Sequence, residues 1–195
     1  LQFEAFDQNV FDPSQAVRFA SSPGSSLSDI SNMIELYESR TNYLKVIQGL
    51  KLNIKINGLD DNESVDINIW SDIDEPTVSN VLKFSFTDSE YSLLDENSNK
   101  IQAAKYGQEI SFNDLRISVN SVNLKEYRTL DINYVNPQSM YNSFKSRMVV
   151  GSLASGNSLF RKEGLITVTY VTADIDLGKE IVNYANSVFL QQRID

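Results

Sequence analysis

The chain has neither histidine nor cysteine among its 195 residues. Without them it cannot build a Ser-His-Asp or Cys-His nucleophilic centre, because these depend on an imidazole base or a thiolate. The usual structural zinc sites and histidine-bearing metal centres are excluded for the same reason. Any chemistry would therefore have to use carboxylates, lysine, tyrosine or a metal ion held by oxygen atoms alone.

Carboxylates are the most numerous of these groups, with 26 Asp and Glu residues. A glycosidase-type pair needs two carboxylates about 5 to 9.5 Å apart across a cleft. No such pair stands out, because most acidic residues lie next to Asn, Ser or Lys in segments typical of turns. We therefore expect no catalytic residue and no enzyme activity in this chain, with an enzyme acting on polysaccharide as the third alternative.

Two acidic segments have residue types that could bind calcium. From Asp95 to Lys100, acidic and amide side chains stand at alternate positions, as in an EF-hand loop. The sixth position is Lys100 instead of glycine and the twelfth is Tyr106 instead of glutamate, so we interpret the segment as a polar hairpin turn. The cluster from Asp60 to Glu63 is also interpreted as a turn, with a weak ion site as the alternative. No bound metal is expected.

The segment from Gly151 to Gly156, GSLASG, has the glycine spacing of a phosphate-binding loop. It lacks the Gly-Lys-Ser/Thr ending, which supplies a lysine to the phosphates and a hydroxyl to magnesium. We therefore predict a flexible loop here, and no nucleotide or other cofactor.

The charge balance narrows the possible partners. The net charge is −9 and the isoelectric point is about 4.5, with Lys and Arg scattered along the chain. Nucleic acid is therefore not an expected partner, since phosphate contacts dominate that affinity. No stretch approaches the roughly 18 apolar residues of a membrane helix. Both ends resemble cut edges of a longer protein, so we expect any membrane anchors to lie outside this chain.

Helical periodicity predicts three helices. One helix starts at Ser28 or Asp29 and continues to Ile47, because apolar residues recur at helical spacing throughout. Pro137 suits the first turn of a second helix. Asp174 is the expected cap of the last helix, whose apolar stripe continues to the end of the chain.

Alternating apolar and polar residues predict strands in residues 1–11, twice within residues 52–70, and repeatedly between Thr77 and Tyr134. A further strand is expected at LITVTYV, after Gly164. The order of these elements predicts an α+β fold.

We divide this fold into two parts. Residues 1–70 and 136–195 are expected to form an α+β base that ends in a truncated long helix. Residues 71–135 are expected to form an inserted, antiparallel, β-sandwich-like module.

Three segments together resemble a known family. Residues 164–195 lead from a strand into a long helix, and residues 29–54 combine a Glu-Ser-Arg step at 38–40 with a Leu-rich close. Residues 84–122 contain a Tyr-x-Leu-Leu-Asp strand, a polar turn, a Lys-x-Gly-Gln step and another strand. This succession resembles the periplasmic domain of bacterial polysaccharide co-polymerases, which include the Wzz chain-length determinants and the Wzc-type exopolysaccharide tyrosine kinases.

The resemblance implies a domain on the periplasmic face of the inner membrane, between two membrane helices that lie outside this chain. Such proteins form homo-oligomeric rings and set the chain length, or help the export, of O-antigen, capsule or exopolysaccharide. Their partners are the polysaccharide polymerase or the export machinery. Any tyrosine-kinase domain would belong to the parent protein beyond this chain.

Glu38, Arg40 and Arg193 are the candidate oligomer contacts, because charged groups on the two flanking helices could bridge subunits. The alternative is that they are solvated surface charges, worth roughly 0 to 1 kcal/mol as pairs.

The runner-up function is a carbohydrate-binding β-module of a secreted or surface protein. Aromatic side chains of the β-rich segment could stack on sugar rings, and the candidates are Trp70, Tyr91, Tyr106 and Tyr127. The alternative is that these side chains pack in the core.

Overall fold

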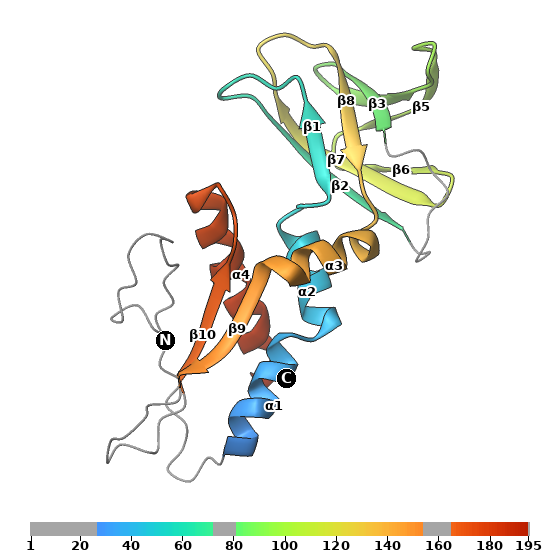
Figure 1. Cartoon of the computed structure of the whole chain (residues 1–195). Helices are drawn as coiled ribbons and strands as arrows, with labels where there is room; N and C mark the ends of the chain where they lie inside the picture. The colour runs from blue at the N-terminus through green and yellow to red at the C-terminus, as the bar shows by residue number, and fades with distance from the viewer. Residues whose placement is uncertain (1–26, 72–80, 154–164, 195) are drawn as a thin grey trace. The chain divides into compact units, whose positions relative to one another are not determined.

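The computed structural model describes residues 27–71, 81–153 and 165–194 of the chain, and only the backbone for residues 27–30, 152–153, 165 and 193–194 (Figure 1). The fold is α+β with antiparallel sheets, which confirms the predicted class. The strand predicted for residues 1–11 lies outside the described residues.

The chain divides into two compact units. Residues 51–140 form one unit, which we call the β unit. The segments on either side, up to Leu50 and from Tyr141 onward, together form the other, which we call the base unit.

The described part of the β unit consists of two antiparallel sheets (Figure 1). One has the strand order β1-β8-β3-β4-β5 and the other the order β2-β7-β6. The strands are β1 (Ile54–Asn57), β2 (Ser64–Ser71), β3 (Val81–Phe86), β4 (Glu90–Leu94), β5 (Lys100–Lys105), β6 (Glu109–Phe112), β7 (Leu115–Asn123) and β8 (Thr129–Tyr134).

Side chains from both sheets share one apolar core, so the β unit is a sandwich. Alternation along β3 is typical: Leu82, Phe84 and Phe86 are buried, whereas the residues between them are not. The buried hydroxyl of Tyr91, on β4, lies 2.7 Å from the carbonyl oxygen of Gln108 and 3.0 Å from that of Ile117, and its single proton is shared between these two acceptors. Tyr91 thereby ties one sheet to the other.

The β unit begins earlier in the chain than the predicted boundary at residue 71. Strand β1 pairs with β8, with Ile54 opposite Tyr134, and β2 pairs with β7 along its whole length. Just outside β1, the Val135 N–H donates to the Asn53 carbonyl at 2.9 Å. Residues 51–70 therefore belong with the sandwich, because their hydrogen-bonding partners lie in its last two strands.

The described part of the base unit consists of three helices, the part of a fourth helix from Tyr141 onward, and a two-stranded hairpin (Figure 1). The start of that fourth helix, residues 137–140, belongs to the β unit. The elements are α1 (Leu27–Tyr37), α2 (Arg40–Gly49), α3 (Pro137–Arg147), β9 (Met148–Leu153), β10 (Leu165–Tyr170) and α4 (Ile175–Ile194). The predicted start at Pro137 is confirmed. The predicted cap at Asp174 is confirmed as well, because its Oδ1 accepts the N–H of Leu177 at 3.0 Å.

The prediction of one continuous first helix was wrong. The chain breaks between α1 and α2, where Ser39 is extended and its side chain accepts the N–H of Asn42 at 3.4 Å as the N-cap of α2. The Asn42 side chain in turn donates to the Leu36 carbonyl of α1 at 2.7 Å. The break shifts the helical phase, so Tyr43 and Val46 are buried whereas Leu44 is half-buried.

Helix α4 completes the core of the base unit by packing against α2 and β10. Its Asn186 accepts a buried hydrogen bond of 2.8 Å from the Tyr37 hydroxyl, and its Phe189 ring lies 5.2 Å from the ring of Tyr37. At Gly49 a Cβ atom would lie 2.1 Å from the hydroxyl oxygen of Tyr184. The end of α2 can therefore approach α4 this closely only without a side chain.

We predict that Gly49→Ala destabilises the base unit. In an open helix this change stabilises by about 0.5–1 kcal/mol, but here the new methyl group meets the Tyr184 ring, and overpacking costs about 1–3 kcal/mol. Urea denaturation should show a lower free energy of unfolding, with a neutral or stabilising effect once Tyr184→Ala has removed the ring. A stabilising effect of Gly49→Ala alone would contradict the close contact.

Candidate functional site

The acidic cluster at Asp60–Glu63 forms a salt bridge within the chain. The Glu63 side chain is 1% exposed and pairs with Arg128 through both terminal guanidinium nitrogens. It also accepts the backbone N–H groups of Asp60 and Lys125, each at 2.9 Å. These hydrogen bonds, from Arg128 foremost, hold the pKa of Glu63 well below its ordinary value. The carboxylate is thus occupied by protein donors.

The segment from Asp95 to Lys100 is a polar hairpin turn between β4 and β5, as predicted. The Asp95 carboxylate accepts the backbone N–H of Asn99 at 2.7 Å and its side-chain amide at 3.0 Å. These bonds lower the pKa of Asp95. Among the described residues, no group of three or more acidic side chains is placed to hold a metal ion.

Gly151 lies in strand β9 opposite Thr167. The predicted flexible loop therefore begins later than Gly151, since β9 continues to Leu153. The rest of that segment, including Gly156, lies outside the described residues.

The four aromatic residues considered for sugar binding occupy different environments. Tyr91 has no exposed surface and belongs to the sandwich core. The Tyr106 ring stacks on Tyr91 at 6.3 Å and its hydroxyl donates to the Thr87 carbonyl at 2.6 Å. Trp70 is half-buried on β2, whereas Tyr127 is 50% exposed between β7 and β8. Tyr91 can therefore contact no ligand, and Tyr106 is held by the fold.

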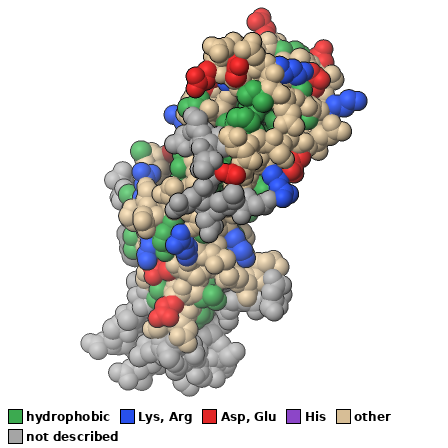
Figure 2. All heavy atoms as spheres, turned by 90° about the vertical axis from the view of Figure 1, so that its right-hand side faces the viewer, with side chains coloured by type: hydrophobic (Ala, Val, Ile, Leu, Met, Phe, Trp, Pro, Cys, Tyr) green, Lys and Arg blue, Asp and Glu red, His purple; other side chains and the backbone are tan. Residues whose placement is uncertain are grey.

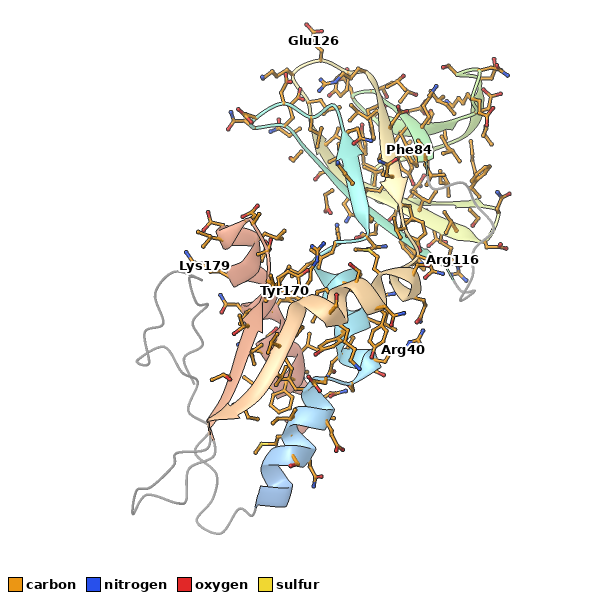
Figure 3. The ribbon with its side chains drawn as sticks, in the orientation of Figure 1. Arg40, Phe84, Arg116, Glu126, Tyr170 and Lys179 are labelled. Atoms are coloured by element: carbon orange, nitrogen blue, oxygen red, sulfur yellow. The ribbon has the colours of Figure 1, made fainter. Side chains whose placement is uncertain are left out.

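The three predicted oligomer contacts have separate surroundings. Glu38 is half-buried at the break between α1 and α2. Arg40 is exposed at the start of α2 (Figure 3). Its guanidinium carbon lies 5.2 Å from the centroid of the Tyr141 ring. The Lys145 ammonium also lies over this ring, at 5.9 Å. The side chain of Arg193 lies outside the described side chains, so the three are not shown to form one surface.

A hollow of about 470 Å³ opens in the β unit where β3 begins, β4 ends and β6 turns into β7. Its walls include Val81 and Ile101, which are 52% and 46% exposed although they are large and apolar. The other lining residues are Leu82, Lys83, Leu93, Leu94, Asp95, Glu96, Phe112, Asn113 and Asp131. The hollow thus combines apolar walls with an excess of carboxylates.

A second exposed apolar surface lies on the base unit, on the outward side of the β9–β10 hairpin. Val149 is 55% exposed and pairs with Thr169, while Val171, just after β10, is 46% exposed. The ladder continues by one bond, because the Val171 N–H donates to the Arg147 carbonyl at 2.9 Å. We call Arg147, Val149, Thr169 and Val171 the hairpin face.

The sequence does not point to this surface directly, because both valines belong to apolar runs that are typical of a buried strand. The available signal is the alternation of side chains along a strand. Val149 follows the buried Met148, and Val171 follows the half-buried Tyr170, so each valine faces the opposite side of the hairpin.

No helix in the described part of the chain is both long and apolar enough to cross a membrane.

No protein-family model matches the chain, and no curated protein does. Among solved structures, two crystal forms of FlgL from Xanthomonas campestris match with TM-scores of 0.30 and 9% identity, over 70% and 72% of this chain and 40% and 46% of theirs. The flagellar hook junction protein FlgK from Burkholderia pseudomallei matches with a TM-score of 0.33 and 9% identity, over 66% of this chain and 29% of that one. The chain spans less than half the length of these proteins, and so low a TM-score supports no conclusion about fold or function.

The salt bridge of Glu63 predicts an acid-sensitive part of the stability. Since the folded pKa is lowered, the contribution is present above the unfolded pKa of about 4.3 and is lost as the pH falls toward the folded value. Glu63→Gln should lower the free energy of unfolding at neutral pH, and this deficit should shrink below about pH 4.

Urea denaturation at a series of pH values measures the deficit of Glu63→Gln. Glu180→Gln, at an exposed position of α4, is the matched control and should show little deficit at any pH. A deficit of Glu63→Gln that stays constant down to pH 2 would contradict the assignment.

Proposed function

We propose that this chain is a non-enzymatic subunit of a scaffold that assembles from copies of itself. The observation that supports the proposal is the hairpin face, where Val149 and Val171 stand exposed on a two-stranded sheet. Contiguous apolar patches that are exposed on a folded protein often mark sites of interaction with another surface.

The strands of the hairpin differ in charge from the outer strands of the larger sandwich sheet. Lysine on an edge strand opposes pairing with further chains, and the two outer strands of the larger sandwich sheet carry it, β1 at Lys55 and β5 at Lys100 and Lys105. By contrast, β9 (MVVGSL) and β10 (LITVTY) contain no charged residue. This difference favours the proposal that the hairpin of the base unit contacts another protein surface rather than only water.

The resemblance to polysaccharide co-polymerases gives the proposal a narrower form. In that form the assembly is a periplasmic ring at the inner membrane, and it controls the length or export of a surface polysaccharide. The support is the order of segments in the sequence. Deleting the gene should then change the length distribution of the surface polysaccharide on a gel, and an unchanged distribution would contradict this narrower form.

The assembly itself can be measured with the purified chain. Sedimentation velocity over a range of concentrations should show self-association. A closed ring would give one species of fixed size, whereas an open filament would grow with concentration. A monomer at every concentration tested would contradict the proposal.

Substitution at the hairpin face tests the surface that supports the proposal. Val149→Asp should weaken the association, because it places a charge in an apolar contact. Leu36→Asp is the matched control at an exposed apolar position of α1, outside the hairpin, and should leave the association unchanged. Far-UV circular dichroism should confirm that both variants are folded.

A further inference from the structure

The hollow of the β unit has the charge of a site for a cationic partner. Three carboxylates line it, from Asp95, Glu96 and Asp131, against the single ammonium of Lys83, which gives a net charge of −2. The Asp95 carboxylate is held by Asn99, whereas Glu96 and Asp131 are exposed to solvent. Anions such as phosphate or nucleic acid are therefore disfavoured as occupants.

The walls of the hollow favour an occupant that is also apolar. Val81 and Ile101 are exposed on β3 and β5, and Leu94 and Phe112 are half-buried beside them. A fully hydrated cation would leave these side chains in contact with water. The chemistry that fits is an apolar side chain next to a basic one.

The hairpin face offers this combination in the same polypeptide. Val149 and Val171 provide exposed apolar surface, and Arg147 stands exposed at the end of the face next to them. Arg147 and Lys145 are the basic residues of the last turn of α3. In the view of Figure 2, Asp and Glu side chains are prominent on the β unit, which also carries Lys and Arg side chains.

We infer that the hairpin face of one copy docks on the hollow of the β unit of the next copy. This inference rests on the proposed self-assembly and names the two surfaces that meet. Valine side chains of the hairpin face contact the apolar walls, and Arg147 lies among the carboxylates of Glu96 and Asp131. The contact joins two different surfaces, so a docked pair keeps one free hollow and one free hairpin face, and addition continues until a ring closes or a filament forms.

Opposite charges at the contact predict two properties of the assembly. Association weakens as salt concentration rises, because exposed and partly exposed charges are screened over about 8–10 Å at physiological ionic strength. Reversing the charge on one side weakens it, because like charges are then brought together.

A charge-swap experiment on the full chain tests the contact. Glu96→Lys in the hollow and Arg147→Glu on the hairpin face should each weaken self-association by about tenfold. The double variant should recover most of the affinity, because the charges are again opposite. The measurement is the concentration dependence of sedimentation velocity, with circular dichroism to show that each variant is folded.

Two substitutions with the same charge changes serve as controls. Glu126→Lys reverses an exposed glutamate in the segment between β7 and β8, and Lys179→Glu reverses an exposed lysine on α4 (Figure 3). Neither lies on the two surfaces, so both should associate like the unsubstituted chain.

The outcomes separate the contact from the proposed function. If the chain assembles and the double variant is no better than either single variant, the assembly stands and the contact between these surfaces is wrong. The same conclusion follows if the controls weaken association equally. If the unsubstituted chain does not assemble at all, the proposed function itself is wrong.

Discussion

The buried hydrogen bond between Tyr37 and Asn186 joins residues that are 149 positions apart in the chain. The core of the base unit has the same constraint throughout, because α1 and α2 precede the β unit whereas most of α3, the hairpin and α4 follow it. Neither half can bury its apolar side chains without the other. Gly49 of α2 shows how closely the two segments approach, because a Cβ atom there would overlap the side chain of Tyr184 of α4. The hairpin face is presented to solvent only because the opposite side of β9 and β10, with Met148 and Ile166, is covered by this joint core.

The local pattern of apolar and polar residues predicted most helices and strands, but it was insufficient at two places. Alternation identified strands such as β3, and end signals identified the helices after Pro137 and Asp174. The sequence signal of strand β6 is weak, because only Ile110 of its four residues is buried and the strand is too short for alternation to appear. The break at Ser39 was missed because apolar residues kept helical spacing on both sides of it, while the cap signal of a single serine was overlooked.

The candidate surfaces were less accessible from the sequence than the elements. The hollow brings together Val81, Ile101 and Asp131 from three strands. They are near each other because β3 pairs with β8 and β4, and β4 pairs with β5. No spacing along the chain encodes that arrangement. Residue type alone was also misleading, since Tyr91 could have bound a sugar but instead bridges two sheets. Arg40 was correctly placed on the surface, yet its visible partner is Tyr141 of its own chain.

The pairing of β1 with β8 has a consequence for the order of folding. The β unit is continuous in sequence and has its own core, so it can fold while α4 is still unsynthesised. Once Ile54 lies opposite Tyr134, the end of α2 and the start of α3 are no longer separated by a flexible chain. Closing a free loop of that length costs about 4 kcal/mol of entropy, and the sandwich removes most of that cost before the helices meet. The folded β unit thus holds together the two chain segments that form the base unit. A mutation that unfolds the β unit would therefore also delay or prevent the folding of the base unit.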